Sequence, residues 1–222
     1  LEGDRGFYAA CCPDATPEEI LADPEKKWQI HQTSIKPWPC CRHTHPAIDA
    51  AIELSNKIDR EFPESITVGL TQATIDVCDN PIPQTVYEAK FSIQHCVSVA
   101  IMNGEVGLDS FESEARWLTK PLNKTITLLC DKKFEKRYPE AWGANIKAEM
   151  KDGKEIVIHR DNAKGDPDAR LSPKEMKDKA MMLFNHAGIE EPLKWIEKIL
   201  CIHKGNSSFS ENDFYQLLNL KA

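Results

Sequence analysis

The sequence predicts an α+β protein, with a mixed α+β unit lying between helical ends. Strand-like segments at 65–75, 124–130 and 145–160 alternate with helical segments in the middle of the chain. A polar stretch, DNAKGDPDAR at 161–170, then separates this unit from a purely helical C-terminal region. This order suggests a domain inserted into a helical body.

Elements of the first third are marked by capping residues and by apolar periodicity. A short helix is predicted over 17–24, with acidic residues in its first turn. Residues 28–38 show no helical period and predict a strand that runs into a proline-rich loop. The next helix is capped by Thr44 and should end near Glu61, because Pro63 follows. Its apolar face consists of Ile48, Ala51, Ile52 and Ile58.

Elements in the middle of the chain are predicted from apolar periodicity and from capping and turn residues. SITVGLTQATI alternates apolar and polar residues and predicts a strand over 65–75. A long helix over 85–103 should end at the C-cap Gly104, and a shorter helix should follow Asp109. KTITLLC predicts a strand, and NIKAEMKDGKEIVIHR predicts a hairpin with a two-residue turn at Asp152-Gly153.

The C-terminal region carries the clearest helix start in the chain. Ser172-Pro173-Lys174-Glu175 is a capping box with proline at the first helical position, and it predicts a helix to about Ala187. Two more helices are predicted near 191–203 and 210–220.

Composition excludes several classes of protein. The 222 residues are 41% hydrophobic and 28% charged, and no apolar run approaches the roughly 20 residues of a membrane span. A net charge of −7 disfavours a nucleic-acid binder, which needs a basic face. The eight cysteines include the adjacent pairs Cys11-Cys12 and Cys40-Cys41, which rarely bridge each other. Reduced thiols in a cytosol-like compartment are therefore expected.

The stretch KPWPCCRHTHPAID, residues 36–49, concentrates reactive side chains. No acidic residue occurs between Gln29 and Ile48, although 35 of the 222 residues are acidic. The segment instead carries Lys36, Arg42 and three histidines just before a predicted helix N-terminus. Such a local cationic cluster favours small anions, carboxylates above all, because arginine offers a bidentate fork and lysine a point charge.

Two other interpretations of this loop stay open. One is a solvated loop with a helix cap, in which His45 only packs or caps. The other is a zinc site made of Cys40, Cys41, His43 and His45. Zinc ligands usually come as two separated pairs, and four candidates within six residues cannot all converge on one tetrahedral centre.

Residues 36–49 resemble the signature K-P-[YFW]-P-x-C-R-x-T-H-x-A-I-D of the MmgE/PrpD family. Three further stretches resemble the family in the same order: LEGDRGFYAA, EAKFSIQHCVSVAIMNG, and AEMKDGKEI followed by LSPKEMKDKAMMLFNHA. The family includes 2-methylcitrate dehydratases, cis-aconitate decarboxylases and iminodisuccinate epimerases. The resemblance implies that this chain corresponds to the C-terminal half of such a protein.

The family fold implied by the resemblance is a large helical domain with a smaller lid-type α+β domain, and the active site lies between them. Residues 1–33 would then end the helical domain, 34–165 would form the lid domain, and 166–222 would return to the helical domain. The implied activity is that of a cofactor-independent hydro-lyase. It would act on a small di- or tricarboxylic acid such as 2-methylcitrate by proton abstraction next to a carboxylate.

Carried over to this sequence, the resemblance implies catalytic roles for Lys36, Cys41 and His45. Lys36 and Arg42 would also bind substrate carboxylates, with Lys90 as a further substrate-binding candidate. No metal or cofactor is implied. Since cis-aconitate decarboxylases align a histidine with Cys41, the cysteine favours a dehydratase or an epimerase over a decarboxylase.

The remaining catalytic groups of the family, an Asp and a His among them, lie in its N-terminal helical half. The chain alone is therefore expected to be inactive until that half, from the same protein or from a separate chain, completes the site. A homodimer, no nucleic-acid or membrane partner, and a cytoplasmic location (the mitochondrial matrix in a eukaryote) are also expected. A catalytically inactive binding member of the family is the alternative from another functional class.

Overall fold

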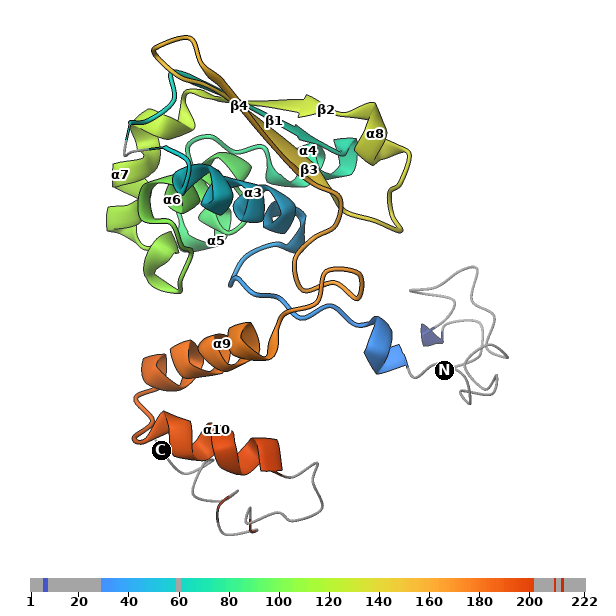
Figure 1. Ribbon diagram of the computed structural model, residues 1–222, viewed down its shortest axis with the longest axis vertical. Helices are drawn as coiled ribbons and strands as arrows, with labels where there is room; N and C mark the ends of the chain where they lie inside the picture. Colours follow the sequence, from blue (N-terminus) through green and yellow to red (C-terminus); the bar gives the residue numbers. More distant parts are fainter. Residues whose placement is uncertain (1–5, 8–28, 59–60, 202–209, 211–212, 214–222) are drawn as a thin grey trace. The chain divides into compact units, whose positions relative to one another are not determined.

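Figure 1 shows a four-stranded sheet with helices packed against one of its faces. The computed structural model describes residues 6–7, 29–58, 61–201, 210 and 213. Contacts divide the chain into two units, residues 1–33 and 34–222. The features below belong to the second unit, except for the 3-10 turn η2 (Gln29–Gln32). The boundary at 165/166 stays a prediction.

The sheet is mixed, with the strand order β2-β1-β3-β4. β1 runs parallel to β2 and antiparallel to β3, and β3 and β4 form an antiparallel hairpin. In this register Val68 lies opposite both Leu128 and Ile146. The strands are β1 (Ser65–Leu70), β2 (Ile126–Cys130), β3 (Ala144–Glu149) and β4 (Glu155–Arg160).

Alternation along the strands separates a buried face from an open one. Ile66, Val68 and Ile146 are at most 1% exposed, whereas Leu129 and Val157 are 58% and 57% exposed. Because successive side chains of a strand point to opposite faces, this contrast identifies the face that packs against the helices.

Three helices of eleven residues each build the helical layer: α3 (His45–Ser55), α6 (Ile93–Asn103) and α7 (Ser113–Asn123). α6 contacts both α3 and α7, and all its residues from Ile93 to Ile101 are buried. A helix that is buried on every side belongs to a core rather than to a surface. Ala47, Ala50 and Ala51 are fully buried, and their small side chains allow close approach to α3.

The predicted fold class is confirmed. The described residues form a mixed α+β structure with eight α-helices, α3 to α10, and the four-stranded sheet. The Gly104 C-cap with φ of +72° and the Ser172–Glu175 capping box are confirmed as well. The remaining helices are α4 (Gln72–Cys78), α5 (Val86–Ala89), α8 (Lys132–Glu135), α9 (Pro173–His186) and α10 (Pro192–Cys201).

Two predicted strand assignments are wrong. Residues 29–32 form the 3-10 turn η2, and no strand follows them before the loop. The strand predicted over 65–75 ends at Leu70, because the Thr71 side chain accepts a hydrogen bond from the Thr74 N–H and starts α4. N-capping therefore overrides the apolar alternation that continues to Ile75.

Three predicted boundaries also differ from the structure. α3 ends at Ser55 rather than near Glu61, and the 85–103 segment is two helices, because Ser92 caps a new helix start. The hairpin strands are confirmed, but their turn covers 150–154 rather than two residues. Helix α8 was not predicted, and the helices expected over 17–24 and 210–220 lie outside the described residues.

Candidate functional site

The loop 36–44 is fixed to the core by its backbone. The Cys41 N–H donates to the Lys90 carbonyl at 2.9 Å, which joins the loop to the break between α5 and α6. The Thr44 hydroxyl donates to the Cys41 carbonyl at 2.8 Å instead of capping α3. The 3-10 turn η3 (Arg42–Thr44) then leads directly into α3. The loop and the start of α6, which are about fifty residues apart in the sequence, are thus neighbours in space.

Lys36 is exposed at the start of this loop. Its Nζ donates to the Cys40 carbonyl at 3.2 Å, a contact that folds the side chain back over the loop. A lysine with one weak neutral partner and an exposed side chain keeps its charge available for a ligand.

Cys41 is half-buried and lies among groups that stabilise its thiolate. Hydrogen bonding from the Cys78 thiol, and then the His43 side chain at 3.4 Å from the sulfur, lower the pKa of Cys41 to about 4. The same contact with Cys41, together with burial, raises the pKa of Cys78. Cys41 is therefore the anionic member of the pair at neutral pH, and Cys78 keeps its proton.

Arg42 is held by a carboxylate of its own chain. Its Nε and Nη2 donate to the two carboxylate oxygens of Asp166 at 3.0 and 2.7 Å. The Ser34 hydroxyl donates to the same carboxylate at 2.7 Å, and the guanidinium carbon lies 4.1 Å from the ring centroid of Trp142. The guanidinium group of Arg42, which is expected to bind a substrate carboxylate, is thus hydrogen-bonded to Asp166 in this structure.

Removing the Arg42 fork should destabilise the fold. Asp166 is 6% exposed, so Arg42→Ala leaves a buried carboxylate without its cationic partner, and we expect a loss of about 2 kcal/mol of unfolding free energy. Arg42→Lys should recover part of this loss, because a lysine keeps the charge but not the fork. Urea denaturation followed by circular dichroism measures both variants.

The matched control is Arg137→Ala. Arg137 pairs with Asp161 at 3.1 Å and also donates to the Asp161 carbonyl and to Asn162. Because both members of this ion pair are more than a third exposed, the expected change is smaller, about 1 kcal/mol or less. Equal changes in Arg42→Ala and Arg137→Ala would contradict the structural role of the Arg42–Asp166 pair.

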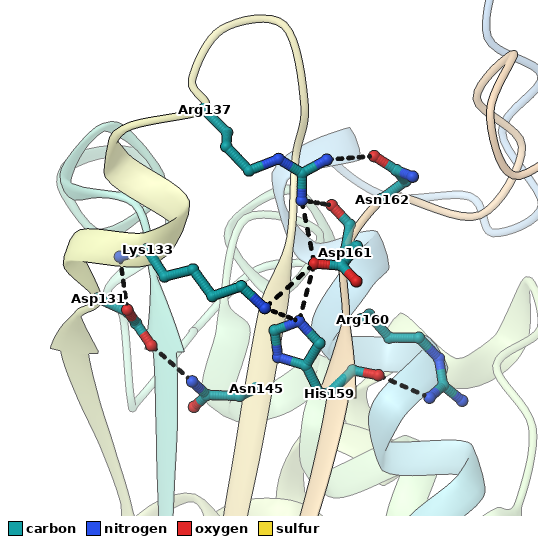
Figure 2. Close-up of polar contacts among 8 residues, drawn as sticks. All are labelled: Asp131, Lys133, Arg137, Asn145, His159, Arg160, Asp161 and Asn162. Atoms are coloured by element: carbon teal, nitrogen blue, oxygen red, sulfur yellow. Dashed lines mark hydrogen bonds and ion pairs between the residues drawn. The ribbon is translucent and has the colours of Figure 1, made fainter.

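The segment 161–170 is irregular but anchored at its start (Figure 2). Asp161 pairs with Arg137 at 3.1 Å and with Lys133 at 3.3 Å, and His159 lies 2.9 Å away. Hydrogen bonds from His159 and Lys133 lower the pKa of Asp161. The His159 Nε2 is also 2.8 Å from the Lys133 Nζ, so this nitrogen either accepts from the lysine or donates to the carboxylate. Asp161 and Asp166 together hold the segment against the α+β unit.

His45 is buried rather than displayed. It is 1% exposed, and its ring meets Trp38 edge-on with 5.3 Å between centroids. Its Nε2 has no hydrogen-bond partner among the described residues. This placement suits a side chain that holds the loop in position more than one that contacts a substrate.

Lys90 lies behind the loop. Its side chain is half-buried with Nζ 5.8 Å from the Phe111 ring centroid, and its carbonyl holds the Cys41 N–H. The structure therefore brings the backbone of Lys90 to the loop, while its ammonium group is turned to an aromatic face.

Several residues of this neighbourhood were missed by the sequence interpretation: Cys78, Trp142 and Asp166. Each comes from a segment at least thirty residues away from the loop, and no local pattern marks it. Asp166 had one available signal. Arg42 lies in a segment without acidic residues, so its carboxylate partner has to come from another part of the chain. The polar stretch 161–170 offers such acids.

No group of three or more His, Cys, Asp and Glu side chains within the described ranges is arranged to hold a metal ion. No helix among those ranges is long and apolar enough to cross a membrane.

The fold and the loop together define a class: a mixed α+β domain that carries a lysine, a cysteine and an arginine immediately before its first long helix. Residues 38–202 match the profile of the MmgE/PrpD C-terminal domain. The chain belongs to the MmgE/PrpD family, whose members are mostly enzymes, dehydratases and decarboxylases among them. A search of curated proteins finds no match.

Proposed function

We propose that this chain is the C-terminal part of a cofactor-independent hydro-lyase that acts on a small di- or tricarboxylic acid such as 2-methylcitrate. The observation that carries the proposal is the family match over residues 38–202, with the Lys36 ammonium exposed on the loop that bears the family signature. In this reaction a proton leaves the carbon next to a carboxylate and a hydroxyl leaves the neighbouring carbon. Negative charge grows beside charges already present, so a fixed cation stabilises the transition state.

The described residues support distinct roles. We assign to Lys36 the pairing with a substrate carboxylate and the delivery of a proton to the departing hydroxyl. Cys41 accepts a hydrogen bond from a substrate hydroxyl, because a thiolate with a pKa of about 4 is too weak a base for a C–H proton. The base is then supplied by the helical half that the resemblance implies.

Arg42 and His45 take positioning roles in this proposal. Arg42 ties the loop to the 161–170 segment through Asp166, and His45 supports Trp38 from the core. Lys90 acts through its carbonyl, which fixes the backbone of Cys41.

A helical partner, from the same protein or from a separate chain, completes the site in this proposal. α9 has no buried residue, and α9 and α10 expose several large apolar side chains. These are Met176, Leu183, Leu193, Ile199 and Leu200, which are 39–55% exposed. Such surface fits docking of further helices or of a second copy. The five free thiols of the described residues fit a reducing compartment such as the cytoplasm or the mitochondrial matrix.

The internal engagement of Arg42 and the burial of His45 favour one second candidate, a binding member of the family without activity. In that case the loop is a structural element, and a polycarboxylate binds without being converted.

The test is an assay of the protein with its helical half supplied in the same chain or by co-expression. 2-Methylcitrate, citrate, cis-aconitate and iminodisuccinate are each incubated with it, and products are followed by NMR. Dehydration of a hydroxy acid supports the hydro-lyase. Epimerisation or loss of CO₂ assigns one of the other family reactions, and binding by calorimetry without turnover supports the inactive member.

A further inference from the structure

His43 is the histidine that the loop 36–44 presents at the surface of the protein. It lies in the turn η3 and is half-buried, whereas His45, two residues later, is 1% exposed. An imidazole at the surface of a cationic loop can bind a ligand, and a fully buried one cannot without a change in the fold. His43 therefore has the access that His45 lacks.

Two contacts fix the orientation of the His43 ring. Its Nδ1 is hydrogen-bonded to the Cys41 sulfur at 3.4 Å, and its ring centroid lies 4.2 Å from that of Trp142. Trp142 is held in turn, since its Nε1 donates to the Pro139 carbonyl at 2.9 Å. Within the described ranges no hydrogen bond to the His43 Nε2 occurs. One nitrogen and one face of the ring are thus fixed, and the second nitrogen remains for a ligand.

The arginine of the same loop is not available in this way. The Arg42 guanidinium carbon lies 4.1 Å from the Trp142 ring centroid, and both carboxylate oxygens of Asp166 accept hydrogen bonds from the guanidinium group. A di- or tricarboxylic acid needs more than one cationic partner, and Lys36 supplies one of them. Of the loop side chains that reach the surface, His43 is then the second that can carry a positive charge without an internal carboxylate partner.

We propose that His43 is a substrate-binding residue, whose Nε2–H donates to a second carboxylate of the ligand while Nδ1 stays bonded to Cys41. This inference rests on the proposed function and adds a carboxylate contact to it. A protonated imidazole has an N–H donor at each nitrogen, so both bonds form together. The ligand carboxylate stabilises the protonated ring, and binding is therefore coupled to the uptake of a proton by His43.

The other charged groups near the ring already have partners. The elements around η3 are α3, α4 and the segment after α8, which packs Tyr138 against Trp142 with 5.6 Å between centroids. Every acid on these elements near η3, and the acid that meets Arg42, is bound within the chain. These titratable and charged groups are Cys41, Arg42 with Asp166, Tyr138, Cys78, Asp76, Asp49 and Glu53. A ligand carboxylate would thus be the counter-charge of the His43 imidazolium.

The experiment measures the binding of propane-1,2,3-tricarboxylate to the protein completed by its helical half. This probe has the three carboxylates of citrate but no hydroxyl group to lose, so binding is read without turnover. Calorimetry in two buffers of different ionisation enthalpy gives both the affinity and the number of protons taken up. His43→Gln should weaken binding by roughly 10- to 100-fold and remove the proton uptake, because a glutamine cannot be protonated.

His159→Gln is the matched control (Figure 2). His159 is also half-buried and also packs on an aromatic ring, that of Phe134, with 5.2 Å between centroids. It lies at the end of β4 and is hydrogen-bonded to Asp161 rather than to the loop 36–44. Its replacement should change neither the affinity nor the proton uptake.

Footprinting of the unmodified protein decides if His43→Gln fails to fold. Diethyl pyrocarbonate modifies accessible imidazoles, and peptide mapping gives the rate at each histidine. The tricarboxylate should slow the modification of His43 at least fivefold and leave that of His159 unchanged. Equal rates at His43 with and without bound ligand would overturn the inference.

The calorimetric outcomes separate this inference from the proposed function. If the unmodified protein binds the tricarboxylate and His43→Gln binds it equally well, the inference is wrong and the proposed function stands. Weaker binding with unchanged proton uptake assigns His43 a purely structural role and also overturns the inference. Absence of binding to the unmodified protein contradicts the proposed function and the inference together.

Discussion

Gly165→Ala is expected to destabilise the protein by roughly 3 kcal/mol, far more than its small change in volume suggests. Gly165 has φ of +94°, and a Cβ at this position would lie 1.9 Å from the backbone oxygen of Ile35. The clash cannot be relieved by a rotamer change, because the obstacle is backbone. The Gly165 backbone is also hydrogen-bonded here: its carbonyl accepts from the Ile35 N–H at 2.9 Å, and its N–H donates to the Ala169 carbonyl at 2.8 Å.

The chain supplies a control that separates the clash from the positive φ. Gly153 has a similar φ of +82°, but a Cβ there meets nothing within 4 Å. Gly153→Ala should therefore cost only about 1 kcal/mol, the conformational penalty alone. Urea unfolding gives both values, and amide exchange over 163–170 shows whether Gly165→Ala detaches this segment. Equal losses of unfolding free energy in the two variants would show that the clash with Ile35 does not affect stability.

The Gly165 contact illustrates what the sequence could and could not predict. Helix ends that are marked by capping residues could be predicted, such as the Ser172–Glu175 capping box and the Gly104 C-cap. Both signals are contained within a few residues, so no knowledge of the fold is needed to recognise them. The 161–170 segment was predicted as a polar linker, and its composition alone does not reveal that Ala163 and Asp166 are buried.

The candidate site shows the same limit at longer range. The absence of acids between Gln29 and Ile48 predicted a cationic loop, yet the acid that neutralises Arg42 is supplied by Asp166. Counting charges within a window overlooks partners that only the fold brings near. Cys78 is missed for this reason too, because the sequence predicts a strand to residue 75 and no helix that ends at Cys78 beside the loop.

Local signals also competed in the middle of the chain. Apolar alternation over 65–75 predicts a strand, whereas in the structure Thr71 caps a helix, α4. The helix forms because the Thr71 hydroxyl accepts a hydrogen bond from the Thr74 N–H, and the hydroxyl oxygens of Thr71 and Thr74 lie 2.9 Å apart. Alternation without a neighbouring strand to pair with is therefore a weaker signal than a satisfied helix start.

Lys36→Met is expected to lower kcat/KM of the completed enzyme by a factor of roughly 100 to 1,000, if the protein is the hydro-lyase that we propose. The loss comes from the chemistry and not from the fold. Lys36 is exposed, and among the described residues its ammonium group is given a hydrogen bond to the Cys40 carbonyl, at 3.2 Å, and no ion pair. The unfolding free energy should therefore change by less than about 0.5 kcal/mol. Lys57→Met, which removes an exposed lysine paired with Glu53 on α3, is the control and should keep full activity.

Lys36→Arg then distinguishes the two roles assigned to this lysine. An arginine keeps the positive charge for a substrate carboxylate, but it does not release a proton near neutral pH. If charge alone matters, Lys36→Arg should retain activity to within about tenfold; if Lys36 delivers the proton to the departing hydroxyl, the arginine variant should be as slow as Lys36→Met. We expect the second result, with KM in Lys36→Arg close to the unmodified value and the loss confined to kcat. Activity of Lys36→Met equal to that of Lys57→Met would remove Lys36 from the mechanism, and with it the exposed cation on which the proposed chemistry depends.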